Sequence, residues 1–316
     1  LGVMAAPIMM RSGYSVRLSA GTIAAGGTLG MLIPPSVMLV VMGPVIGVPV
    51  TELFAAAMVP GVLLAVLYTA YAIIRCYINP ELGPALPVDQ RAESGYEIMR
   101  ELVVGIFPLA VLMMSVLGSI LAGLATPTDA AAMGALGALL LAVAYRRLTW
   151  PRLKEAVYRT IQTSSMILLL VAASNFYGAV FARLGTATMI ADALLQMQLP
   201  PMALLALILG LVFLLGWPLE WVPIVLVVIP ILLPLVIDLG IDLVWFSILV
   251  AVCLQTAWLS PPVALSAYYI KGVVPDWDLK DIYIGMMQFM VIQLIGLIFI
   301  LFFPALALWL PTLLFR

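Results

Sequence analysis

The sequence predicts an all-α integral membrane protein, built as an inverted repeat with two broken helices and re-entrant hairpins. Three observations lead to this fold class. First, 65% of the 316 residues are hydrophobic and only 9% are charged, whereas soluble domains carry about 25% charged residues. Second, two apolar segments are too long for simple membrane crossings, and each contains a proline pair, Pro34-Pro35 or Pro261-Pro262. Third, landmarks around the first pair recur about 228 residues later.

The apolar runs predict the membrane segments in order, since about 20 apolar residues cross a bilayer as a helix. Between polar breaks these runs are 18–47, 53–78, 103–124, 128–145, 160–182, 200–216, 221–237, 243–271 and 282–310, after a partial segment at 1–10. The proline pairs break segments 18–47 and 243–271, because proline lacks an amide donor and clashes one turn back. Segments 200–216 and 221–237 are the arms of one hairpin, because the join Trp217–Glu220 carries no basic residue.

The basic residues predict the sidedness of these segments. Positively charged residues collect in short cytoplasmic loops, and five of the 14 Lys and Arg residues lie in the loop 146–159. Counting crossings outward from this loop places twelve of the 14 on the cytoplasmic side. The linker 80–101 is then cytoplasmic, and the C-terminus lies on the opposite face. Within the loop, Pro151–Arg159 is basic and amphipathic, which favours a helix lying along the membrane interface.

The repeated landmarks indicate two halves of the chain. They are Gly13 with Gly240, Thr28 with Thr256, Pro34-Pro35 with Pro261-Pro262, and Glu52-Leu53-Phe54 with Asp281-Ile282-Tyr283. The predicted sidedness runs the two broken helices in opposite directions, so the halves are antiparallel in the membrane. Because the second half has far more residues before its break, we expect about 125 residues of a complete pair to precede Leu1.

Three parts follow along the chain. The first, 1–79, is the C-terminal part of a first repeat, with a hairpin tail, the broken helix 18–47 and the helix 53–78. The second is the linker 80–101, rich in proline and acidic residues. The third, 102–316, is the second repeat, with the hairpin 200–237, the broken helix 243–271 and a last helix 282–310.

Composition excludes most catalytic chemistry. The chain has no histidine, which removes zinc-binding HExxH motifs, Ser-His-Asp triads and imidazole proton relays. No paired nucleophile and base, and no pair of intramembrane aspartates, is visible, so we expect no enzyme and no organic cofactor. The net charge of −1 gives no excess to attract nucleic acid. Cys76 and Cys253 lie in apolar stretches and are predicted to be packing thiols rather than metal ligands.

The segment Gly26–Ser36 is the first candidate binding site. Its glycines and prolines prevent a regular helix. Non-helical backbone at membrane depth is tolerated where it lines a cavity or is buried in protein, and paired breaks point to a transport site. Carbonyl oxygens with the Thr28 hydroxyl suit Na⁺, a hard cation. A packed proline kink is the alternative for a single segment, but the twin break at Leu254–Pro262 favours a functional site.

Two polar motifs lie outside the breaks. Glu220 is at the tip of the hairpin, where Gly216 and Pro218 make the turn. Its carboxylate either orders the tip, contributes to a cation site or lies in a wet cavity. The sequence Thr126-Pro127-Thr128-Asp129 has the form of a helix capping box, so we interpret Asp129 as structural.

Three motifs resemble the large membrane subunit of tripartite ATP-independent periplasmic (TRAP) transporters, the DctM-like family. They are Ile23-Ala24-Ala25-Gly26-Gly27-Thr28-Leu29-Gly30-Met31-Leu32-Ile33-Pro34-Pro35-Ser36, Ala125-Thr126-Pro127-Thr128-Asp129-Ala130-Ala131-Ala132 and Leu254-Gln255-Thr256-Ala257-Trp258-Leu259-Ser260-Pro261-Pro262. The resemblance implies an elevator-type, Na⁺-coupled importer in the bacterial inner membrane, with a periplasmic C-terminus. It further implies a small membrane subunit and a periplasmic substrate-binding protein as partners, and an organic acid such as a C4-dicarboxylate as substrate.

The resemblance also implies site residues. One sodium site maps onto Gly27, Thr28 and Gly30, and it would be incomplete here because the first hairpin's tip would precede Leu1. The second maps onto Gly216, Gln255 and Thr256. Substrate or gating candidates are Pro34, Pro35, Glu220, Ser260, Pro261 and Pro262. At position 129 this chain has Asp where the family motif has Glu, and the tip reads Trp-Pro-Leu-Glu, which leaves the substrate subclass open.

Two alternatives stay open at this point. One is another ion-coupled anion transporter of the same inverted-repeat architecture. The other is a channel, which can also use carbonyl-lined breaks. Coupling to Na⁺ rather than H⁺ is favoured, because the chain offers no histidine and few intramembrane carboxylates to titrate.

Overall fold

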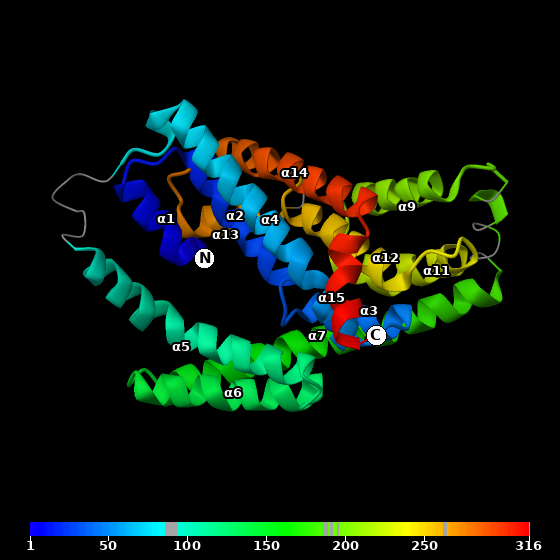
Figure 1. Ribbon diagram of the computed structural model, residues 1–316, viewed down its shortest axis with the longest axis horizontal. Helices are drawn as coiled ribbons and strands as arrows, with labels where there is room; N and C mark the ends of the chain where they lie inside the picture. The colour runs from blue at the N-terminus through cyan, green and yellow to red at the C-terminus, as the bar shows by residue number, and fades with distance from the viewer. Residues whose placement is uncertain (86–93, 186–188, 190–191, 195, 262–263, 316) are drawn as a thin grey trace. The chain divides into compact units, whose positions relative to one another are not determined.

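The computed structural model describes the chain except for residues 86–93, 186–188, 190–191, 195, 262–263 and 316. Every secondary-structure element in the described part is helical (Figure 1). In chain order the elements are α1 (Gly2–Arg11), α2 (Val16–Leu32), α3 (Val37–Ile46), α4 (Val50–Ile78), η1 (Pro80–Leu82), α5 (Gly95–Leu121), α6 (Pro127–Ala144), α7 (Trp150–Arg183), α9 (Pro201–Leu215), α10 (Trp221–Pro223), η3 (Ile224–Val228), α11 (Ile229–Asp238), α12 (Leu243–Gln255), η4 (Thr256–Trp258), α13 (Leu265–Val273), α14 (Leu279–Phe302) and α15 (Ala305–Phe315).

The lengths and composition of these helices fit a membrane protein. Among the described residues, six helices are long and apolar enough to cross a membrane, and the pair α2 and α3, bent by 43°, makes a seventh. The predicted all-α integral membrane class is therefore confirmed. The inverted relation between the two halves stays a prediction from the sequence.

The chain divides into two compact units, Leu1–Ala85 with Leu170–Arg316, and Leu86–Leu169. In the first unit, α2 packs along α14, and both helices contact α4 (Figure 1). Phe54, Phe246 and Phe289 are among its largest fully buried side chains. The broken helices and the hairpin tip all belong to this unit, so its packing positions the candidate site.

Helices α2 and α14 touch backbone to backbone. A Cβ atom at Gly21 would lie 2.6 Å from the carbonyl oxygen of Gly285. A Cβ atom at Gly285 would overlap the carbonyl oxygen of Arg17 and lie 2.8 Å from its carbonyl carbon. Nearby, Arg17 Nε donates to Asp281 Oδ1 at 2.8 Å. Small residues allow such close approach of helices, so these glycines set the spacing of the central helix pair.

The second unit contains α5, α6 and the first part of α7. Helix α6 packs on α5 with Gly134 against Val116, where an added Cβ would lie 2.9 Å from the valine Cγ2. At the start of α6, the Thr126 hydroxyl accepts from the Asp129 amide at 3.2 Å and donates to Asp129 Oδ2 at 2.6 Å. The structural cap predicted for this motif is therefore confirmed.

Both predicted broken helices are interrupted, but the expectation that Gly26–Ser36 is irregular from its glycines onward is wrong, because α2 stays helical as far as Leu32. A glycine weakens a helix by only about 1 kcal/mol and keeps its amide donor, whereas the prolines lack that donor and end the helix. Helix α2 gives way to α3 across residues 33–36, and Ser36 caps α3 by accepting from the Leu39 amide at 3.4 Å. Helix α12 passes through the 3₁₀ turn η4, and the described residues 259–261 that follow are not helical. Of the second proline pair, Pro262 lies outside the described residues.

The predicted hairpin 200–237 has two helical arms, α9 and the run α10, η3 and α11, joined by the turn Gly216–Glu220. The five residues of η3 form a π-helix, which the sequence analysis did not anticipate. Such π-bulges are rare and occur often at functional sites.

The predicted last helix, 282–310, is wrong as a single element. Helix α14 ends at Phe302, and a separate helix, α15, begins at Ala305. Pro304 has no amide hydrogen to continue the ladder and restricts the preceding Phe303, whose φ of −121° and ψ of 76° are not helical. Hydropathy alone does not reveal this boundary, because α14 and α15 are both apolar.

Two other boundaries also differ from the prediction. The linker predicted over 80–101 ends early, because α5 begins after Ser94, whose Oγ accepts from the Tyr96 amide at 3.2 Å. Pro151–Arg159 is not a separate interfacial helix, since α7 runs on without interruption for 34 residues. No glycine or proline follows near Arg159 to end the helix there.

Candidate functional site

The second break begins where α12 tightens into η4. The Thr256 side chain is 1% exposed, and its hydroxyl donates to the Cys253 carbonyl at 2.6 Å. Ser260 is fully buried, and its hydroxyl has no hydrogen-bond partner among the described residues. The Ser266 hydroxyl donates to the Trp258 carbonyl. The Thr256 and Ser260 hydroxyls are therefore buried in and just after η4, whereas the Ser266 hydroxyl is partly buried at the start of α13.

The hairpin tip meets this second break. Gly216 is buried, and a Cβ atom there would lie 3.4 Å from Ala257 Cβ in η4. Next to it, Trp217 and Phe213 pack edge to face, with 5.8 Å between ring centroids. The structure thus places Gly216 of the tip beside Ala257, the residue that follows Gln255 and Thr256, the other two residues assigned to this sodium site. Whether they bind sodium stays a prediction.

Glu220 lies at the other end of the tip and is half-buried. It occupies the N-cap position of α10, but its carboxylate makes no capping hydrogen bond. The option that Glu220 orders the tip by capping this helix is therefore wrong. A contribution to a cation site, or a place in a wet cavity, remains open for this side chain.

At the first candidate site, the backbone of α2 is exposed at two glycines. Thr28 is 2% exposed, and its hydroxyl donates to the Ala25 carbonyl at 2.8 Å. A Cβ atom at Gly27 or Gly30 would meet no atom within 4 Å. These two glycines therefore face open space, whereas Thr28 points into the helix packing. The three residues assigned to the first site lie on two sides of α2.

A direct hydrogen bond joins the two breaks. Gln255 Nε2 on α12 donates to the Thr28 carbonyl on α2 at 2.9 Å. The sequence analysis assigned these residues to different sites, but the structure places them in contact. Two further buried residues, Tyr68 and Gln293, continue this chain of hydrogen bonds. Sequence reasoning missed both, although a glutamine inside the apolar stretch of 282–302 is a signal for a polar contact between helices.

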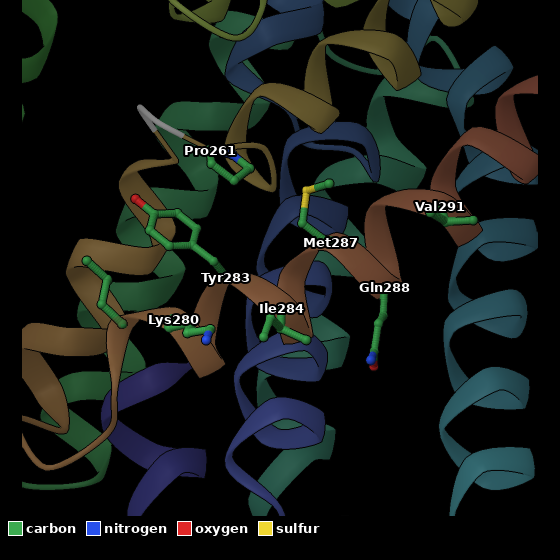
Figure 2. A pocket seen from close by; sticks show the side chains of 8 residues that line it. Pro261, Lys280, Tyr283, Ile284, Met287, Gln288 and Val291 are labelled. Carbon is green, nitrogen blue, oxygen red and sulfur yellow. The ribbon is translucent and has the colours of Figure 1, made fainter.

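The proline candidates differ in their surroundings. Pro34 is buried and Pro35 is exposed. Pro261 lines an open groove of about 720 Å³ together with residues of α14, as Figure 2 shows. The other residues on the wall are Leu279, Lys280, Tyr283, Ile284, Met287, Gln288 and Val291. The groove is mainly apolar and lies beside the second break.

The donor set suits a hard monovalent cation better than a transition metal. In the part of the chain that the structure describes, no group of three or more Cys, Asp or Glu side chains forms a metal-binding cluster. The oxygens at the breaks are carbonyls and hydroxyls. Such neutral oxygen ligands match the preference of hard cations.

Comparison with known proteins gives a consistent result. The family model described as "Tripartite ATP-independent periplasmic transporter, DctM component" matches residues 1–306. The chain is 29% identical to the C4-dicarboxylate TRAP transporter large permease protein DctM of Rhodobacter capsulatus, over 99% of this chain and 73% of that protein. It is 30% identical to the sialic acid TRAP transporter large permease protein SiaM of Vibrio cholerae, over 99% and 72%. It is 28% identical to the 2,3-diketo-L-gulonate TRAP transporter large permease protein YiaN of Escherichia coli, over 84% and 61%.

Proposed function

Because the chain belongs to the DctM component family of tripartite ATP-independent periplasmic transporters, we propose that it is the large membrane subunit of a sodium-coupled importer of an organic acid. A periplasmic substrate-binding protein delivers the acid, and a small membrane subunit completes the complex in the bacterial inner membrane. The names of relatives support this substrate class, since they specify a C4-dicarboxylate, a sialic acid and 2,3-diketo-L-gulonate. The family consists of transporter components, which excludes an enzyme.

The observation that carries the proposal is the contact between the hairpin tip and the second break. Gly216 lies next to Ala257 of η4, and the buried Thr256 is the preceding residue of the same turn. A sodium ion bound there takes carbonyl and hydroxyl oxygens from both elements and so holds the tip against the break. Discontinuous helices with coordinating carbonyls are the usual ion sites of secondary transporters.

The substrate site follows from the same geometry. Helices α3 and α13 begin directly after the two breaks, and helix N-termini carry partial positive charge. A carboxylate is attracted to these ends once sodium has ordered the tip, which couples the two solutes. A rigid-body movement of the part that carries both breaks then exposes the site to the other face of the membrane, as in an elevator.

Coupling to sodium rather than to protons is supported by the side chains at the breaks. Thr28, Gln255, Thr256 and Ser260 are all buried and uncharged, and the chain has no histidine. None of these groups exchanges a proton near neutral pH. These uncharged groups favour a bound sodium ion over a titrating side chain at the breaks as the source of the coupling charge.

The test is uptake into proteoliposomes that contain the complete complex with its own binding protein. A panel of labelled organic acids is offered under an inward sodium gradient, an equal potassium gradient or a proton gradient. We expect uptake of at least one acid to require both sodium and the binding protein. Equal uptake with potassium, or uptake driven by the proton gradient alone, would refute the proposed coupling. Conductance that does not saturate with substrate would indicate a channel.

A further inference from the structure

We infer that Tyr68 and Gln293 are positioning residues that couple the two helix breaks, so that a change at one break is transmitted to the other. Neither residue is assigned to an ion or substrate site. The inference rests on the proposed function only for the identity of the ion that binds at the breaks. The coupling itself is a property of the hydrogen bonds between four helices.

The chain of hydrogen bonds starts on α4 and ends at the first break. The Tyr68 hydroxyl donates to Gln293 Oε1 on α14 at 3.1 Å. Gln293 Nε2 donates to Gln255 Oε1 on α12 at 3.0 Å and to the Val252 carbonyl at 2.8 Å. Gln255 Nε2 donates to the Thr28 carbonyl on α2 at 2.9 Å. All of these helices lie in the first compact unit.

Burial makes this chain of bonds sensitive to each of its members. Gln255 and Gln293 have no exposed surface, Thr28 is 2% exposed and Tyr68 is 5% exposed. No water is at hand to replace a lost partner in such surroundings, so removing one group leaves its neighbour unsatisfied. The bonds also run in one direction, since each amide oxygen accepts from the preceding donor and each amide nitrogen donates onward. The orientation of Gln255 is therefore set by Gln293, and that of Gln293 by Tyr68.

The last bond of this series, from Gln255 to Thr28, joins the two candidate ion sites. Gln255 is the last residue of α12 and directly precedes Thr256 in η4. Thr28 lies one turn before the end of α2, between Gly27 and Gly30. An ion that binds carbonyl oxygens at the second break thus shifts Gln255, which is hydrogen-bonded to Thr28 at the first site. An ion at the first site acts on Gln255 through the same bond. This gives a physical path for cooperative binding of two ions.

A second tyrosine–glutamine pair on α4 and α14 provides a matched control. The Tyr71 hydroxyl donates to Gln288 Oε1 at 3.0 Å, which joins α4 to α14 in the same way. Tyr68 and Tyr71 even pack on the same ring, Phe289, at centroid distances of 5.8 and 5.1 Å. Gln288 lies on the wall of the groove in Figure 2 and, among the described contacts, makes no bond to either break. Loss of the Tyr71–Gln288 bond weakens the contact between α4 and α14 but leaves the hydrogen bonds from Tyr68 to Thr28 intact.

The first experiment measures hydrogen exchange in the complete, detergent-solubilised complex, in peptides that cover residues 26–33 and 254–260. We expect Tyr68→Phe and Gln293→Met to accelerate exchange about two- to tenfold in both segments, which corresponds to the loss of one buried hydrogen bond. Tyr71→Phe should change neither segment. Should Gln293→Met fail to fold, Tyr68→Phe decides, because it removes a single oxygen atom. Acceleration confined to α4 and α14, or equal to that of Tyr71→Phe, overturns the inference.

The second experiment measures how uptake into proteoliposomes depends on sodium. Tyr68→Phe should raise the half-saturating sodium concentration about threefold or more and lower the Hill coefficient toward one, with maximal uptake retained. Tyr71→Phe should leave both unchanged, and a purely structural loss would lower only the maximal uptake. Unchanged sodium dependence in Tyr68→Phe contradicts the coupling. If wild-type uptake shows no sodium dependence, the proposed function fails, and the exchange measurement still decides the inference.

Discussion

The substitution Gly285→Ala tests the packing of α14 on the start of α2, the helix that leads into the first break. Gly285 lies on α14, opposite the backbone of Arg17 on α2, and an added Cβ would overlap the Arg17 carbonyl oxygen. The same atom would lie 2.8 Å from the Arg17 carbonyl carbon and 3.0 Å from its Cα. These are backbone atoms, so no side chain can rotate away to accept the methyl group.

The size of the effect follows from these distances. Carbon atoms in contact normally lie about 3.5–4.0 Å apart, so the 2.8 Å contact requires α2 and α14 to separate by about 0.7–1.2 Å. Overpacking of this kind costs about 1–3 kcal/mol, while the better helix propensity of alanine offsets about 1 kcal/mol at most. We expect the complex to lose about 1–2 kcal/mol of stability, with a wider spacing between the two helices.

The assay is the unfolding of the solubilised complex by heat and by denaturant, with Gly210→Ala as the control. Gly210 lies inside α9, and a Cβ atom there would meet nothing within 4 Å, so this variant should be neutral or slightly stabilised. The reasoning is refuted if Gly285→Ala unfolds at the same temperature and denaturant concentration as Gly210→Ala. If Gly285→Ala retains uptake at low temperature, the substitution damages helix packing and not the transport site.

Three further predictions concern the site and the cap. Thr256→Ala should raise the sodium concentration needed for half-maximal uptake severalfold, whereas Thr256→Ser, which keeps the hydroxyl, should behave as wild type; equal sodium dependence in both variants removes this hydroxyl from the site. Glu220→Gln should leave thermal stability unchanged, because the carboxylate makes no capping bond; if it also leaves sodium-dependent uptake unchanged, Glu220 is no part of a cation site. Thr126→Val removes the cap of α6 and should destabilise that helix by about 1 kcal/mol, measured as faster hydrogen exchange in its first turn; unchanged exchange there would contradict the capping role.

The positions of the two breaks were predictable because they depend on local chemistry. Proline acts on the backbone within one turn, whatever surrounds it. Helix α2 ends at Leu32, two residues before Pro34, and the 3₁₀ turn η4 that follows α12 ends at Trp258, three residues before Pro261. The same holds for Thr126, whose capping bond to Asp129 spans three residues. The predicted last helix, 282–310, was wrong for the same kind of local reason, because Pro304 interrupts it.

The contacts between the breaks could not be predicted in this way. The sequence separates Thr28 from Gln255 by 227 positions and Tyr68 from Gln293 by 225. In so apolar a chain, a lone glutamine shows that a partner must exist but not which helix supplies it. Only the packing of α2, α4 and α12 with α14 selects these partners.

The sequence by itself thus determined the membrane class, the family and the presence of two broken helices. Composition, proline position and motif spacing are properties of the chain alone. The tertiary structure decided that Gly216 meets Ala257, that Glu220 makes no cap, and that the two breaks share a hydrogen-bonded path. Those facts depend on distances between segments far apart in the chain, and such distances are set by close packing at places such as Gly21 and Gly285.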